Sequence, residues 1–247
     1  MHKLILVFLL LSISLFAEVI TIAVAANVSY AMDELKSEFE KKHPDVKVRI
    51  VLGSSGKLTA QIRNGAPYGI FMSADMKYPQ RLFKDNLALK QASVYAQGTL
   101  ALFSLKAREF SLGIELLKDT SIQKIALANA KTAPYGAAAK QALEAAGLYK
   151  DLKTKFVYAE SISQTLSYVF TAADIGIVAK ASLYSKKMTN YKEKIHWISI
   201  EPSLYNPINQ GVVLLKYSKN AQGYKAFYRF ILSKDARQIF KKYGYTV

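Results

Sequence analysis

The segment Gly-Ser-Ser-Gly at residues 53–56 has residue types that could bind a ligand. An apolar, β-branched run at residues 49–52 precedes it, and Leu58 and Ile62 follow at helical spacing. A turn from a strand into a helix leaves backbone N–H groups without intrahelical acceptors, and two serine hydroxyls lie beside them. Such a turn can bind an anion through neutral dipoles, although a capped turn in any α/β protein would have the same sequence.

Four predicted helix starts carry small polar side chains or free backbone donors. They are Ala26-Asn27, Ser54-Ser55-Gly56, Pro134-Tyr135-Gly136 and Ser161-Ile162. Two precede and two follow the strand predicted over residues 96–103, which we interpret as a crossing between two lobes. This arrangement is what a two-lobed clamp on a small anion would require.

The surrounding pattern predicts an α/β protein whose helix starts lie at the ends of strands. The mature chain opens with a strand at 19–26, a helix at 29–42 and a strand at 46–52, and such strand ends bind ligands in open parallel sheets. A return crossing is expected at residues 207–215, before a helix pair in residues 220–244. We therefore expect lobe 1 at residues 18–95 plus 210–247, and lobe 2 at residues 96–209, with the cleft between them.

Residues that could carry catalysis or hold a metal cation are scarce. The chain has no cysteine, and its three histidines, His2, His43 and His196, form no metal-ligand or Ser-His-Asp pattern. We predict that the protein is not an enzyme, with no catalytic residue, no cofactor and no cation site. A secreted hydrolase using Ser54 or Ser55 is the alternative from another class, but Gly-Ser-Ser-Gly is no nucleophile elbow.

The N-terminus and the charge balance bear on location. A short basic start, an apolar run and Ala17 predict a signal peptide at residues 1–17, and therefore a periplasmic protein. The formal net charge is +16, yet Lys and Arg residues are scattered along the chain. This pattern favours a solvated basic surface over a nucleic-acid partner.

Six segments together resemble the periplasmic molybdate-binding proteins of ABC transporters, and they span nearly all of the mature chain. They are AANVSYAM (25–32), GSSGKLTAQIRNGAP (53–67), FMSAD (71–75), APYG (133–136), DIGIV (174–178) and KKYGY (241–245). The resemblance implies a type II periplasmic-binding-protein fold, with two lobes joined by two crossing strands. Each lobe would have a mostly parallel sheet flanked by helices, and the oxyanion would bind between the lobes.

The resemblance also implies which residues bind the oxyanion. Ser55 would donate its hydroxyl and N–H, Asn27 its N–H and its amide, and Tyr135 and Ile162 their backbone N–H groups. Ala26, Ser54 and Ser161, at the same helix starts, are secondary candidates. Many family members have a tyrosine after the G-I-V strand, where this chain has Ala179. One donor is therefore missing, and the preference between molybdate and tungstate is left open.

The function that the resemblance implies is a monomeric receptor that passes molybdate or tungstate to an ABC permease. A doubly charged tetrahedral anion offers only acceptors, so a pocket of donors suits it, whereas singly protonated phosphate also needs an acceptor. Sulfate is likewise a pure acceptor and differs in size. A sulfate- or tungstate-specific receptor is therefore the alternative within the same fold.

Overall fold

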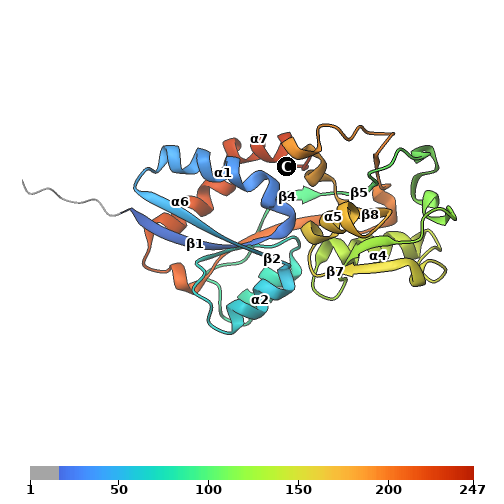
Figure 1. The fold of residues 1–247 in the computed structure, drawn as a ribbon. Helices are drawn as coiled ribbons and strands as arrows, with labels where there is room; N and C mark the ends of the chain where they lie inside the picture. The colour runs from blue at the N-terminus through green and yellow to red at the C-terminus, as the bar shows by residue number, and fades with distance from the viewer. Residues whose placement is uncertain (1–16) are drawn as a thin grey trace, which may run out of the picture.

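The structure, a computed structural model, describes residues 17–247, whose strands form two five-stranded sheets. Figure 1 shows them as the two halves of an elongated molecule, with β1 and β2 in one half and β7 and β8 in the other. The predicted signal peptide lies outside the described residues except for Ala17. Helices flank both sheets, which confirms the predicted two-part α/β fold.

The first sheet has the strand order β2-β1-β3-β10-β4. Its strands are β1 (Glu18–Ala25), β2 (Val46–Gly53), β3 (Ile70–Met72), β4 (Ser93–Gly98) and β10 (Ile208–Leu214). β1 pairs in parallel with β2 and β3, whereas β10 pairs antiparallel with β3 and β4. The sheet is therefore mixed, where a mostly parallel one was expected, because β10 returns from the second half of the molecule.

Helices cover both faces of the first sheet because its strands are apolar on both sides. Ile20, Ile22 and Val24 of β1 pack against one group of helices, and Ala23 packs against the other, following the two-residue period of a strand. The first group is α1 (Ser29–Lys42), α6 (Gln222–Ile231) and α7 (Lys234–Lys242), and the second is α2 (Ser55–Arg63) and α3 (Lys77–Lys84). The bounds of α1 confirm the predicted helix.

The second sheet has the order β7-β6-β8-β5-β9 and the same mixed pairing. Its strands are β5 (Leu100–Phe103), β6 (Ile125–Ala128), β7 (Phe156–Ala159), β8 (Ile175–Ala179) and β9 (Trp197–Ser199). α4 (Pro134–Ala145) packs on one face and α5 (Ile162–Thr171) on the other. Each of these two helices begins just beyond the carboxyl end of a parallel strand, β6 or β7.

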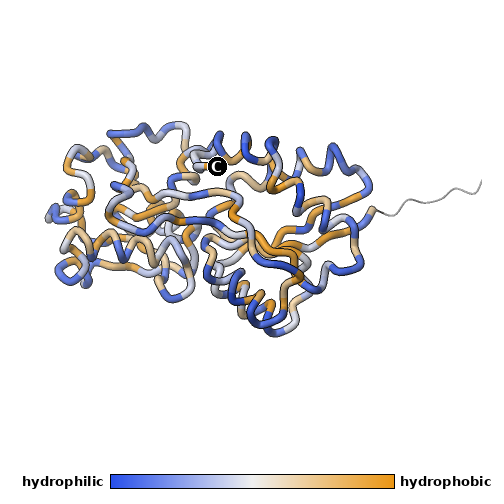
Figure 2. Tube along the Cα trace, turned by 180° about the vertical axis from the view of Figure 1, so that it is seen from behind, coloured by the Kyte–Doolittle hydropathy of each residue, from blue (hydrophilic) through white to orange (hydrophobic). Residues whose placement is uncertain are grey.

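Short 3-10 segments join these elements. They are η1 (Ala26–Val28), η2 (Phe110–Lys118), η3 (Lys153–Lys155), η4 (Lys180–Tyr184), η5 (Lys186–Met188), η6 (Pro202–Leu204) and η7 (Lys216–Ser218). η1 matters most for the site, because it carries β1 directly into α1. Figure 2 shows hydrophobic stretches inside each half and hydrophilic ones along the outer helices. Among residues 17–247, no helix has the length and apolar character needed to cross a membrane.

The chain passes between the sheets at two places. The single strand expected over residues 96–103 is divided at Thr99 into β4 and β5, which belong to different sheets. The chain returns between β9 and β10. Ala96 and Gln97 pair with Gln210 and Asn209 in the first sheet, so the expected division after residue 95 lies inside β4.

Candidate functional site

A small cavity lies where elements of the two sheets meet. The space open to the centre of a water-sized molecule is about 10 Å³, roughly the room for one water molecule, so a bulky organic ligand is excluded. It is lined by ten residues, four of which are alanines: Ala25, Ala26, Asn27, Ser54, Ser55, Ala74, Ala133, Pro134, Tyr135 and Ile162. Six of the seven predicted site residues are thus brought together.

Helix starts from both halves face this cavity. Ser55 and Ile162 are the first residues of α2 and α5, and Tyr135 follows Pro134 at the start of α4. Backbone N–H groups in a first helical turn have no acceptor within their own helix. Proline at the first position of α4 is favoured there, since its fixed φ matches the helix and it has no N–H to satisfy. The positive ends of three helix dipoles therefore surround the cavity.

The two serines contribute differently. The Ser55 hydroxyl oxygen accepts a hydrogen bond of 3.0 Å from the Ala74 N–H, which fixes the oxygen and leaves the hydroxyl proton for a ligand. Ser54 is the N-cap residue of α2, and its buried hydroxyl has no partner among the described residues. A buried hydroxyl without a partner is costly unless something else binds it, so Ser54 is also a candidate donor.

Asn27 is fully buried in η1 and belongs to a polar network. Its Nδ2 lies 2.7 Å from Gln210 Oε1, 3.2 Å from the Tyr245 hydroxyl and 3.5 Å from the Tyr135 hydroxyl. Its Oδ1 is buried without a partner among the described residues. Two of the cavity-lining side chains, Asn27 and Ser54, therefore have a polar atom that only a ligand or water can satisfy.

The residues that line the cavity include no Lys, Arg, Asp, Glu or His. Lys57, next to Ser55 in sequence, instead forms an exposed ion pair of 2.7 Å with Glu160. Burial, and then the neighbouring Tyr245 and Tyr95, hold the pKa of the Tyr135 hydroxyl well above its ordinary value. An anion here would be held by neutral dipoles in a site shielded from water.

Direct contacts join the two halves around the cavity. The Gly56 N–H donates to the Thr132 carbonyl at 2.9 Å, and the Ser163 hydroxyl donates to the Ala26 carbonyl at 2.7 Å. Ala25, Ala26 and Ala74 pack within the same apolar cluster as Tyr135 and Ile162. The structure is thus a conformation in which the helix starts of both sheets already face one another.

Two residues discussed from the sequence lie outside the cavity lining. The Ser161 hydroxyl caps α5 by accepting from the Gln164 N–H, as an ordinary N-cap serine does. Ala179 is buried at the end of β8 and offers no side-chain donor. Of the two unpartnered buried groups, the Ser54 hydroxyl can donate to an anion in place of a side chain at position 179, whereas Asn27 Oδ1 is an acceptor and its Nδ2 already donates within the network.

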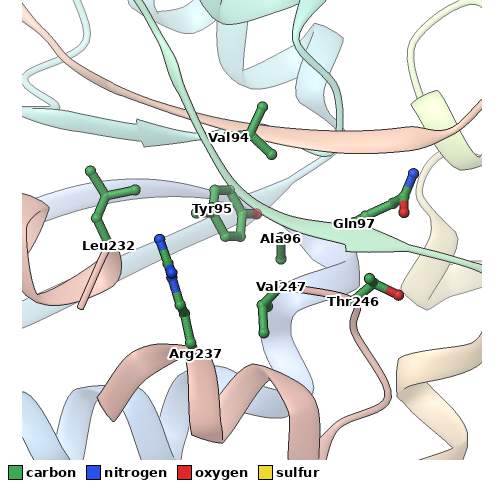
Figure 3. Close-up of a pocket in the computed structure, with 8 residues that line it drawn as sticks. All are labelled: Val94, Tyr95, Ala96, Gln97, Leu232, Arg237, Thr246 and Val247. Atoms are coloured by element: carbon green, nitrogen blue, oxygen red, sulfur yellow. The ribbon is translucent and has the colours of Figure 1, made fainter. Parts of the chain in front are cut away.

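A larger pocket lies elsewhere, beside β4 and the C-terminal residues (Figure 3), with a volume of about 240 Å³. Its one charged lining residue is Arg237 of α7, and Val94, Tyr95, Ala96 and Gln97 line it from β4. All its lining residues belong to the first half of the molecule, and no helix start converges on it. Although this pocket is larger, the small cavity between the two sheets is the better candidate for an anion-binding site.

Comparison with known proteins decides the family. The family model described as bacterial extracellular solute-binding protein matches residues 20–246. The chain belongs to this family. It is 35% identical over 239 residues to the molybdate-binding protein ModA of Azotobacter vinelandii, covering 96% of this chain and 93% of that protein. This membership confirms the prediction that the protein is not an enzyme.

Two further relatives support the assignment. A solved structure of the Azotobacter vinelandii periplasmic molybdate-binding protein matches with a TM-score of 0.85 and 32% identity, over 92% of this chain and 99% of that one. Bacillus subtilis YvgL, a candidate ABC transporter substrate-binding lipoprotein, is 29% identical over 228 residues, covering 92% of this chain and 86% of that protein.

Residues 17–247 contain no group of three or more His, Cys, Asp or Glu that could hold a metal ion.

Proposed function

We propose that this solute-binding protein binds molybdate, and also tungstate, in the cavity between the two sheets and delivers the anion to an ABC permease. The observation that carries the proposal is the convergence of helix starts and neutral polar groups from both sheets on one small cavity without a charged lining residue. Its relationship to molybdate-binding proteins supports the choice of anion.

In this proposal each donor has a defined source. Ser55 donates its hydroxyl and N–H, and Asn27, Tyr135 and Ile162 donate backbone N–H groups. The Ser54 hydroxyl is the free side-chain donor where Ala179 has none. No resident cofactor or cation takes part. Recognition by full hydrogen bonding in a dry site favours an anion that accepts at every oxygen, because a protonated one would leave its own donor unpaired.

Transport requires two lobes that can separate and close. The natural division follows the sheets, with Thr99 and the segment between β9 and β10 as the connections. Closure over the anion would then be the signal to the permease, by population shift toward the closed state. We further propose export to the periplasm by residues 1–17 and action as a monomer, without a nucleic-acid partner.

A thermal-shift screen of the mature protein tests the anion. Molybdate, tungstate, sulfate, phosphate and chromate would be compared at equal ionic strength. A ligand at about 100 times its Kd stabilises the fold by about 2.7 kcal/mol, which raises Tm by roughly 5–10 °C in a chain of this size. We expect that shift with molybdate and tungstate. A shift with sulfate alone would replace the ligand, and no shift with any oxyanion would contradict the proposal.

The affinity for molybdate is expected to stay constant from about pH 6 to pH 9, since no lining side chain titrates there. The pKa of Tyr135 is raised by burial, so its hydroxyl remains protonated and neutral through this range. Binding would weaken only at higher pH, where loss of this proton would place a negative charge beside the anion. Calorimetric titration across the range checks this, and a tenfold change between the two limits would contradict it.

A further inference from the structure

The hydroxyl of Tyr135 reaches from one half of the molecule into the other. Tyr135 belongs to α4 on the second sheet and is 1% exposed. Its hydroxyl lies 3.2 Å from Gln210 Nε2 and 3.5 Å from Asn27 Nδ2, two fully buried side chains that belong to the first half. The backbone N–H that we propose for anion binding and this hydroxyl therefore belong to the same residue.

Gly98, at the end of β4, makes room for this hydroxyl. A Cβ at position 98 would lie 1.8 Å from the Tyr135 hydroxyl oxygen and 2.8 Å from Gln210 Nε2. Any larger residue there would therefore have to displace Tyr135. Gly98 ends the strand that precedes the first crossing, so the hydroxyl enters at the junction between the two sheets.

Gln210 connects the Tyr135 hydroxyl to Asn27. Gln210 lies in β10, and its Oε1 accepts from Asn27 Nδ2 at 2.7 Å and from the Tyr95 hydroxyl at 2.8 Å. Figure 3 shows Tyr95 on β4, where its ring lines the neighbouring pocket. Burial raises the pKa of the Tyr95, Tyr135 and Tyr245 hydroxyls above their ordinary values, so all three remain neutral.

In the observed hydrogen-bond arrangement, the Tyr135 hydroxyl proton and Asn27 Oδ1 both lack a partner among the described residues. With Gln210 Nε2 directed at Tyr135, the Tyr135 hydroxyl proton has no acceptor in the network, and Asn27 Oδ1 has none of the donors it needs. The oxygen and nitrogen of an amide occupy nearly the same space. Exchanging them in both Asn27 and Gln210 lets Tyr135 donate to Gln210 Oε1 and Gln210 Nε2 donate to Asn27 Oδ1. The exchange also requires Tyr95 to donate to the Ser73 carbonyl at 3.4 Å instead of to Gln210, and Tyr245 to donate to Asn27 Oδ1 instead of to the Asn27 carbonyl. Asn27 then has its NH2 group, rather than its oxygen, at the unpartnered position.

We propose that Tyr135, through its hydroxyl, is a positioning residue that orients the Asn27 amide as a donor when the two halves close. The hydroxyl occupies the space beside Gly98. In the exchanged arrangement it donates to Gln210 Oε1, and Gln210 Nε2 then donates to Asn27 Oδ1 and so fixes the orientation of the Asn27 amide. The inference rests on the proposed function and deepens it, because it names the source of selectivity. A closed site with an Asn27 donor accepts molybdate, whereas an Asn27 oxygen would suit the hydroxyl of protonated phosphate.

The test compares the wild type with Tyr135→Phe, which keeps the proposed backbone donor and removes the hydroxyl. We expect the dissociation rate of molybdate to rise about five- to tenfold, the loss of one or two neutral hydrogen bonds, with little change in association rate. The ratio of the Kd for phosphate to the Kd for molybdate should fall in the same variant. Nitrogen-15 NMR adds a direct signature: the Asn27 side-chain NH2 signals should shift with molybdate in the wild type and shift less in the variant.

Two more variants sharpen the comparison. Gly98→Ala should also raise the dissociation rate, and its effect should shrink in a Tyr135→Phe background, because the closest clash is with the missing hydroxyl. Tyr149→Phe removes an exposed hydroxyl that contacts Tyr158 and should leave binding unchanged.

The results separate two failures. If the wild type binds no oxyanion, the proposed function is wrong and this inference falls with it. If the wild type binds molybdate but Tyr135→Phe and Gly98→Ala keep its dissociation rate and its discrimination against phosphate, this inference alone is wrong. A lowered Tm without a change in dissociation rate would indicate a merely structural role and would also overturn it.

Discussion

Replacing Ser55 by alanine is expected to weaken molybdate binding by about 1–3 kcal/mol, because one hydrogen bond to a charged ligand is lost. The structure adds a second effect that the sequence could not indicate. The Ser55 oxygen is the acceptor for the Ala74 N–H, so the variant leaves a buried donor unpaired. We therefore expect a loss of folding stability of about 1–3 kcal/mol as well.

Calorimetry for the Kd and denaturant unfolding for the free energy would measure the two effects separately. Lys57→Ala is the matched control in the same helix, since Lys57 forms an exposed ion pair across the two halves and does not line the cavity. Its effect on binding should stay within about 1 kcal/mol. Equal affinity in Ser55→Ala and the wild type would remove Ser55 from the site, and a large loss in Lys57→Ala would contradict binding by neutral dipoles.

Replacing Gly136 by alanine is the second change expected to weaken binding strongly. A Cβ at this position would lie 2.3 Å from the Ala128 carbonyl oxygen and 2.7 Å from its carbon. These are backbone atoms at the end of β6, so the start of α4 must move instead. Overpacking of this kind costs about 1–3 kcal/mol of stability, and it displaces both the N–H and the hydroxyl of Tyr135. Binding should weaken by at least tenfold, about 1.4 kcal/mol.

Gly147→Ala provides the control at the other end of the same helix. Gly147 has a φ of +73° and no atom within 4 Å of the added Cβ, so alanine there is strained without moving the helix start. A left-handed conformation costs alanine about 1–2 kcal/mol, and affinity should remain that of the wild type. If both variants bind equally well, the position of the α4 start does not govern recognition.

Local patterns accounted for the elements and for the first contacts of the site. The apolar spacing in residues 29–42 predicted the bounds of α1. The local pattern also indicated the four helix starts, within which the resemblance to the family singled out Asn27, Ser55, Tyr135 and Ile162, and these four now line one cavity. The roles of these residues as anion donors remain predictions. Nothing in the side chains of Tyr135 and Ile162 suggests anion binding, so their assignment came from the resemblance, at helix starts that the sequence pattern had also indicated.

The remainder depends on contacts that a linear pattern does not contain. Gly98 lies within residues 96–103, over which the sequence predicts one strand, but the structure ends one strand there and starts another in a different sheet. The sequence predicts Gln210 only as part of the return crossing. Its hydrogen-bond partners Asn27 and Tyr95 are over 100 residues away in sequence, so no local pattern indicates them. A polar amide inside a segment predicted as a crossing strand was the available sequence signal for its importance.

The bond between the Gly56 N–H and the Thr132 carbonyl has a consequence for how the protein can diverge. Both atoms are main-chain atoms, as are the helix-start N–H groups around the cavity. Substitutions that replace a side chain leave such contacts in place as long as the chain follows the same path. A Cβ at position 56 would lie 3.0 Å from the Thr132 carbonyl oxygen. This contact between the two halves therefore depends on a small residue at position 56 more than on the identity of the surrounding side chains.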